Sequence, residues 1–131
     1  MKKIFLIGIL ITVTNLVAQS EVQKFRSKYY YMYAMDSEDG KIITPMGKNV
    51  ELTFDPFFKK YEFTYTDSEG NLIATKLTFI KEAFGNGWLM KDTFGHRYFV
   101  YSLLKENRLL CVMEEKVKGL VISFEITNEL H

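Results

Sequence analysis

The sequence predicts an all-β domain, an antiparallel meander of eight or nine short strands that forms a small barrel or a strongly curved sheet. Three observations indicate this fold class. Beyond residue 20, apolar and polar residues alternate with the two-residue period of strands. Residues that favour tight turns separate the alternating segments at short intervals. No segment beyond residue 20 combines a helical apolar stripe with helix caps.

The alternation is clearest in 48–54, 60–66 and 120–126, where one face is apolar and the other is polar. Antiparallel strands with one face on a core and the other in water have this pattern. Three segments are apolar on both faces, so each is covered twice or turns one face to a ligand or a partner. These segments are 25–35, 97–104 and 109–114. The complete set of expected strands is 25–35, 41–44, 48–54, 60–66, 72–81, 88–92, 97–104, 109–114 and 120–126.

The expected core must hold the fold without a disulfide, because Cys111 is the only cysteine. It lies within the apolar run 109–113, which indicates a small buried apolar side chain. A domain of this length can bury a sufficient core without such links. The residues expected in that core are Phe63, Leu77, Val100, Ile122 and Phe124.

The N-terminus has the parts of a secretory signal peptide. Lys2 and Lys3 precede an apolar run over 4–13, and small residues follow. The run ends at Thr14, whereas a membrane-spanning helix needs about 20 apolar residues. We therefore expect a leader that is cleaved, of the kind used in bacterial export.

Cleavage is expected after Ala18, with a cut after Ser20 as the alternative. The domain boundaries are then 1–18 for the signal peptide and 19–131 for a single β-rich domain. No cysteine lies directly after the cleavage site to carry a lipid. The sequence thus predicts a periplasmic or secreted protein without a stable membrane anchor.

The charge balance argues against a nucleic-acid partner. The chain has 17 Lys and Arg residues and 16 Asp and Glu residues, and its formal net charge is +1. Loss of Lys2 and Lys3 with the leader makes the net charge about −1. The basic residues are scattered, so the positive patch typical of a nucleic-acid binder is absent from the sequence.

The sequence also lacks the usual signatures of catalysis and of metal binding. His96 and His131 are the only histidines, and no metal-binding spacing of His or Cys is present. There is no Gly-x-Ser-x-Gly motif and no glycine-rich phosphate loop. We therefore expect no enzyme activity, no cofactor and no metal.

The aromatic content is the most distinctive feature, with 8 Tyr, 11 Phe and 1 Trp. Such rings fill a core, or they form an amphipathic wall around a ligand. Five of them are the candidate ligand-binding residues: Tyr29, Tyr31, Phe57, Phe58 and Trp88.

Their positions in the chain explain this choice. The two tyrosines share one face of a strand that is apolar on both sides. The two phenylalanines follow Asp55-Pro56, which predicts a single helical turn in a connection. There they form either a binding lip or a plug at one end of a barrel. Trp88 follows Gly85-Asn86-Gly87 and is expected near a rim.

The C-terminal part of the chain resembles lipocalin-like (calycin) domains of bacterial envelopes. The segment 98–110, YFVYSLLKENRLL, is similar to closing strands of that family with the pattern Y-x-V-x-x-L, and 119–126, GLVISFEI, is similar to its final strand. The resemblance implies a meandering antiparallel barrel. The family's opening Gly-x-Trp is absent, so no functional residue is carried over.

These observations lead to two functional hypotheses. The first is non-catalytic binding of a small apolar or amphipathic ligand. The alternative is a protein–protein interaction module of the envelope or the exterior, such as an inhibitor or an assembly component. A lumen lined by the second apolar faces favours a ligand, and a flat exposed apolar patch favours a partner.

Overall fold

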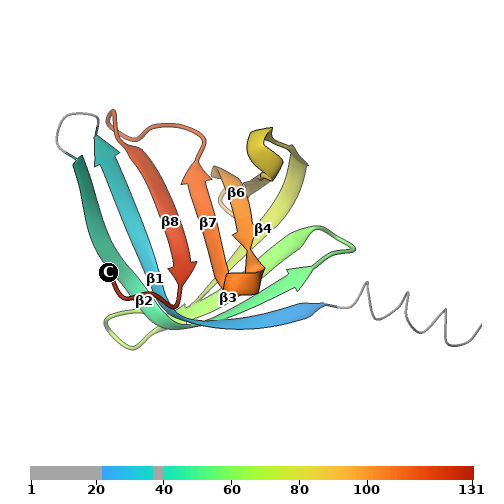
Figure 1. Cartoon of the computed structure of the whole chain (residues 1–131), viewed down its shortest axis with the longest axis horizontal. Coiled ribbons are helices and arrows are strands. Elements are labelled where there is room, and N and C mark those ends of the chain that lie inside the picture. The colour runs from blue at the N-terminus through green and yellow to red at the C-terminus, as the bar shows by residue number, and fades with distance from the viewer. Residues whose placement is uncertain (1–21, 37–39) are drawn as a thin grey trace, which may run out of the picture.

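The eight strands close into a barrel in which every strand pairs with the next one in the chain, and β8 pairs with β1. A computed structural model describes residues 22–36 and 40–131. Figure 1 shows this meander, and it confirms the predicted all-β antiparallel fold. The strands are β1 (Gln23–Asp36), β2 (Gly40–Asp55), β3 (Lys60–Thr66), β4 (Leu72–Glu82), β5 (Trp88–Lys91), β6 (Arg97–Leu103), β7 (Arg108–Met113) and β8 (Val121–Thr127).

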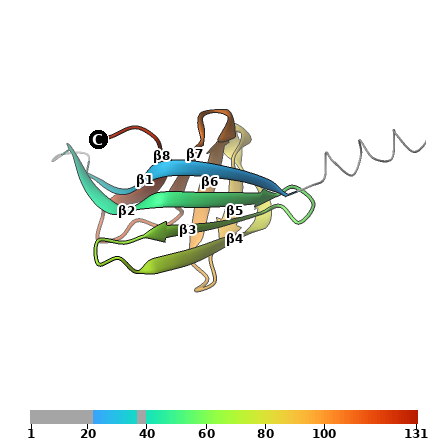
Figure 2. The same ribbon diagram turned by 90° about the horizontal axis from the view of Figure 1, so that it is seen from below.

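The first four strands lie side by side and cross the later strands (Figure 2). Two short 3-10 segments interrupt the later connections, η1 (Phe84–Asn86) and η2 (Leu104–Glu106). Within the described residues, no helix is long and apolar enough to cross a membrane. The expected signal peptide at 1–18 lies outside the described residues.

Strand β2 corrects one expectation. The sequence predicted separate strands at 41–44 and 48–54, but β2 runs without a break through Pro45. The part of β2 before Lys48 pairs only with β1, because the pairing with β3 begins at Lys48 opposite Thr66. Proline is tolerated at such an edge, where its missing N–H removes no ladder hydrogen bond. The barrel therefore has eight strands, the lower of the two expected numbers.

The core occupies the inside of the barrel, as the alternation predicted. Phe63, Leu77, Val100 and Ile122 are buried. Phe124 packs against the hydrophobic core inside the barrel but is only partly buried. It borders an internal cavity, which accounts for the difference.

The wall of the barrel is uneven between β4 and β5. Strand β4 has 11 residues and β5 has 4. Their pairing covers only the second half of β4, from Thr78 opposite Lys91 onward. Beyond Lys91 the chain turns at Asp92–His96 and enters β6. On its β5 side the first half of β4 therefore faces this turn instead of a paired strand, while its other side pairs with β3.

Candidate ligand-binding site

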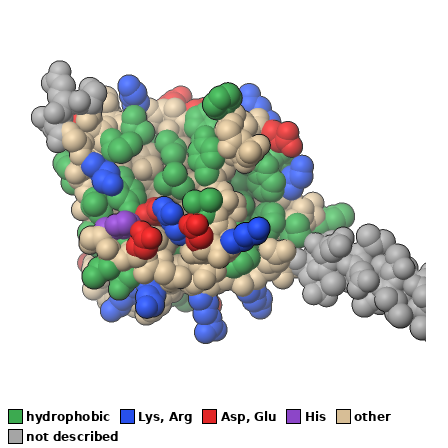
Figure 3. Space-filling view, in the orientation of Figure 1, with side chains coloured by type: hydrophobic (Ala, Val, Ile, Leu, Met, Phe, Trp, Pro, Cys, Tyr) green, Lys and Arg blue, Asp and Glu red, His purple; other side chains and the backbone are tan. Residues whose placement is uncertain are grey.

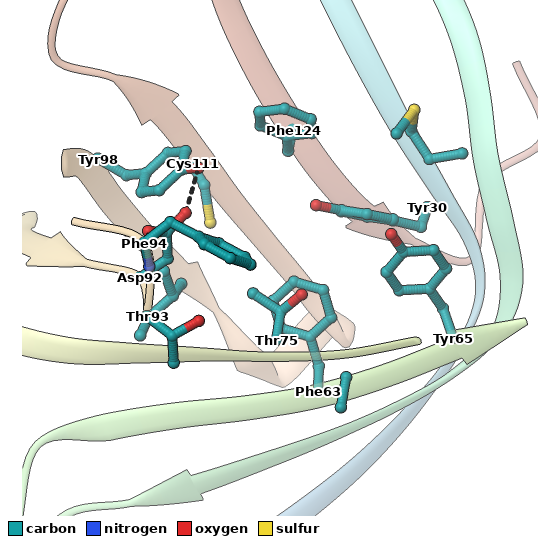
Figure 4. A pocket seen from close by; sticks show the side chains of 13 residues that line it. Tyr30, Phe63, Tyr65, Thr75, Asp92, Thr93, Phe94, Tyr98, Cys111 and Phe124 are labelled. Carbon is teal, nitrogen blue, oxygen red and sulfur yellow. Dashed lines mark hydrogen bonds between the residues drawn. The ribbon is translucent and has the colours of Figure 1, made fainter. Parts of the chain in front are cut away.

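A cavity of about 190 Å³ lies inside the barrel, next to the turn between β5 and β6. Seven strands contribute inward-facing side chains to its wall, all except β5 (Figure 4). Ala74 on β4 and Phe94 in the turn line the cavity and are also exposed to solvent. The cavity thus opens sideways, where the first half of β4 has no paired strand on its β5 side.

Aromatic rings form a continuous arc around this cavity. Tyr30 is central to it, because its ring centroid lies 4.7 Å from that of Tyr65, 5.3 Å from that of Phe63 and 6.0 Å from that of Phe124. Tyr98 extends the arc, with its ring 6.1 Å from Phe124. These five rings come from β1, β3, β6 and β8. The alternation of each strand places them on the inner face.

Two tyrosine hydroxyls inside the barrel have no hydrogen-bond partner among the described residues. Tyr30 and Tyr65 are each 8% exposed, and neither hydroxyl forms a hydrogen bond to a described residue. Neither oxygen is sealed off, since the only fully buried side-chain atom without a partner in the described part of the chain is Arg108 Nε. Figure 4 shows the Tyr30 hydroxyl pointing into the cavity. Buried polar groups are nearly always bonded, so these hydroxyls indicate a place for a ligand or water.

Burial also fixes the protonation of these phenols. Desolvation raises the pKa of Tyr30 and of Tyr65 above the ordinary value for tyrosine. Both hydroxyls are therefore neutral at physiological pH. Each offers one O–H donor and acceptor lone pairs to a bound molecule.

Among the described residues of the cavity wall, Asp92 is the one with a formal charge. Its Oδ1 accepts hydrogen bonds from the backbone N–H groups of Phe94 and His96, both at 2.9 Å. Its Oδ2 accepts one from the Tyr98 hydroxyl at 2.9 Å and lies 3.3 Å from His96 Nδ1. Burial alone would raise the pKa of this carboxyl, but the hydrogen bonds outweigh burial and lower it. Asp92 is thus a carboxylate at neutral pH.

Cys111 lies in the cavity wall and is buried, as the sequence predicted. Desolvation raises the pKa of its thiol to about 12. Because the thiolate is the reactive form of cysteine, this residue serves here as an apolar wall group.

The predicted residues Tyr29 and Tyr31 lie outside the barrel. Their rings stack at 5.9 Å and line an outer groove of about 360 Å³, which Leu130 and His131 border on the other side. Tyr31 is 3% exposed, and its hydroxyl accepts a hydrogen bond from the His131 backbone N–H at 3.2 Å. The C-terminal residues, and not a lumen, cover this face of β1.

The other three predicted residues lie elsewhere. Phe57 and Phe58 are 73% and 68% exposed in the connection between β2 and β3, with their rings in edge contact at 4.9 Å. Asp55 Oδ1 accepts hydrogen bonds from both of their backbone N–H groups, as expected of a cap, although the connection is a turn and not a helix. Trp88 faces inward and is half buried, with its ring 5.3 Å from Phe79. The structure therefore does not bring the five predicted residues together.

The exposure of Phe57 and Phe58 predicts the outcome of replacing both with serine. Surface substitutions change stability by about 0.5 kcal/mol or less. We expect the melting temperature of the double variant F57S/F58S to stay close to that of the parent, as calorimetry would show. A collapse of stability would instead mean that the two rings plug the barrel.

Sequence reasoning placed Phe63, Leu77 and Phe124 of the cavity wall in the core, but it did not identify Tyr30, Tyr65 or Asp92 as site residues. Alternation was the available signal. It places Tyr30 on the face of its strand opposite to Tyr29 and Tyr31, and it places Tyr65 on the same face as the expected core residue Phe63. Asp92 gave no signal beyond turn chemistry.

The described residues also contain no group of three or more His, Cys, Asp or Glu side chains placed to hold a metal ion. In comparisons with known proteins, no family model, no curated protein and no solved structure matches this chain.

Proposed function

We propose that the protein is an exported, lipocalin-like barrel that binds one small amphipathic molecule in its lumen without transforming it. The observation that carries this proposal is that the buried residues Tyr30 and Tyr65 bring two hydroxyls without a partner among the described residues to a cavity with aromatic walls. Eight-stranded up-and-down barrels have an interior of the size that holds one small ligand.

The volume sets the size of the ligand. Pockets for drug-sized molecules measure about 300–1,000 Å³, whereas a cavity of about 150 Å³ accepts benzene. At about 190 Å³, the lumen suits a molecule with one ring or a short branched chain. Its apolar part would pack on Phe63 and Phe124, and its polar part would meet the hydroxyls of Tyr30 and Tyr65.

The chemistry of the wall supports binding over catalysis. A nucleophile needs an activating base or a lowered pKa, whereas burial raises the pKa of the Cys111 thiol. Both oxygens of Asp92 are already engaged by Tyr98 and by its own turn. A general base needs a free oxygen within reach of the proton it takes.

A variant that fills the lumen tests this proposal. Replacing Cys111 with leucine adds a larger side chain at the wall, and replacing it with alanine leaves the space open. We expect p-cresol to bind to the parent and to the C111A variant in calorimetric titrations, and to bind C111L at least about tenfold more weakly, a difference of about 1.4 kcal/mol. Thermal melts of each variant check that it is folded. Equal affinity of C111L, or no binding to the folded parent, would contradict lumen binding.

One observation favours the alternative, a protein-interaction module. Strands β6 and β7 are apolar on their outer face as well. Phe99, Tyr101, Leu110 and Val112 point away from the core there and are only half buried. Figure 3 shows apolar side chains gathered over this side of the barrel. Apolar patches of this kind are typical of partner surfaces.

Native mass spectrometry of protein purified from its own host separates the two functions. Lumen binding predicts an added small-molecule mass that C111L loses. An interaction module predicts a retained protein partner that C111L keeps and that a Phe99→Glu variant loses.

A further inference from the structure

We propose that the lumen is selective for small organic cations, amines or quaternary ammonium groups, over neutral and anionic molecules of the same shape. This inference rests on the proposed lumen binding and names its ligand class. Three features of the cavity wall carry it: its charge, its rings and its unpaired oxygens.

The charge of the wall is negative. Asp92 lines the cavity, its side chain is 9% exposed, and no Lys, Arg or His among the described residues lines the cavity with it. An anionic guest such as a fatty acid would therefore enter an apolar space beside a carboxylate without any compensating cation. Burying an unpaired charge is strongly unfavourable. The wall thus rejects anions, and a guest cation balances Asp92.

The five rings act in the same direction. An aromatic face attracts a cation within about 6 Å of its centroid, and aromatic cages bind quaternary ammonium groups in this way. Tyr30, Phe63, Tyr65 and Phe124 surround one side of the cavity, and Tyr98 joins them next to Asp92 (Figure 4). A cation in the lumen is therefore close to several rings at once.

The tyrosine hydroxyls of the wall add unpaired acceptor lone pairs. The hydroxyl oxygens of Tyr30 and Tyr65 have no donor among the described residues. They can accept hydrogen bonds from an ammonium N–H. Asp92 acts by its charge and not by a new hydrogen bond, since three donor groups and the His96 ring nitrogen Nδ1 already surround its two oxygens.

A pair of ligands of equal shape isolates the effect of the ligand's charge on its affinity. Choline and 3,3-dimethyl-1-butanol differ by a quaternary nitrogen in place of a carbon, and 3,3-dimethylbutanoate supplies a comparable anion. Titration calorimetry is carried out at low salt, where screening of the Asp92 charge is weakest. We expect choline to bind at least about tenfold more tightly than the alcohol, which is about 1.4 kcal/mol, and we expect no binding of the anion.

Two variants assign the selectivity to its sources. Asp92→Asn keeps a side-chain oxygen for the turn, since asparagine makes the same local turn bonds, and it removes the charge. It should lower the affinity for choline toward that for the alcohol and leave the affinity for the alcohol unchanged. Phe124→Leu replaces a ring by an aliphatic side chain and should weaken the binding of choline more than the binding of the alcohol. Melting curves confirm that both variants fold.

The outcomes separate this inference from the proposed function. Equal binding of choline and the alcohol, tighter binding of the anion, or no binding of choline by a protein that binds p-cresol would each overturn the cation selectivity and leave lumen binding intact. Failure of p-cresol and of all three ligands would overturn both.

Discussion

Replacing Phe63 with alanine is expected to lower the free energy of unfolding by about 3–5 kcal/mol, the usual cost of removing a buried phenylalanine ring. Phe63 is 3% exposed and contacts the rings of Tyr30 and Tyr65 at 5.3 and 6.2 Å. Single domains are stable by only about 5–15 kcal/mol. The variant should therefore unfold at a much lower urea concentration than the parent, as urea titration would show.

Phe58→Ala is the matched control for this loss. It removes the same ring from a position that is 68% exposed, so the unfolding free energy should stay within about 0.5 kcal/mol of the parent value. If Phe63→Ala also melted within a few degrees of the parent, the inner face assigned to β3 would be wrong.

The second large effect is expected at Glu125, on the outer face of β8. Its Oε1 accepts a hydrogen bond from the Tyr33 hydroxyl at 2.5 Å and lies 3.1 Å from His131 Nε2. Its Oε2 accepts one from Arg108 at 2.6 Å. The Glu125 side chain is 8% exposed and that of Arg108 is 32% exposed. Breaking a buried pair costs about 3–5 kcal/mol, and since Arg108 is partly solvated we expect about 2–3 kcal/mol for Glu125→Ala.

The pH dependence of stability gives an independent measure of this network. Burial would raise the pKa of the Glu125 carboxyl, but hydrogen bonds from Tyr33, Arg108 and His131 outweigh burial and lower it. The folded-state pKa is therefore below the unfolded value of about 4.3. The stabilisation is complete above that value and is lost as the pH falls through the folded pKa.

Melting temperatures between about pH 2 and pH 7 test this sign. Glu125→Gln cannot lose a proton, so its stability should fall less steeply in acid than that of the parent. Part of the fall should remain, because Asp92 also has a lowered pKa. An acid slope in Glu125→Gln as steep as that of the parent would contradict the assignment.

The strand pattern was largely predictable because it depends on local alternation. The segment 60–66 reads as a strand from its own residues, and its inward side chains are those that are buried. The merger of 41–44 with 48–54 was not predictable, because it depends on which strands flank β2. Local sequence does not show that the stretch around Pro45 lies at an edge.

The site was harder to predict, because it depends on contacts between distant residues. The face of β1 that carries Tyr31 is covered by His131, 100 residues further along the chain. Alternation alone left open whether the protein itself covers this face or whether it meets a ligand or a partner. It also could not show that the rings around Tyr30 leave a cavity, since empty space depends on how side chains from seven strands meet.

The most direct test of lumen binding is the position of a heavy-atom ligand in the protein. Crystals soaked with 4-bromophenol give an anomalous bromine signal that locates one bound molecule. The proposed function predicts a bromine site enclosed by Tyr30, Cys111 and Phe124. A bromine site in the outer groove beside Tyr29, or on Phe57 with an empty lumen, would contradict it.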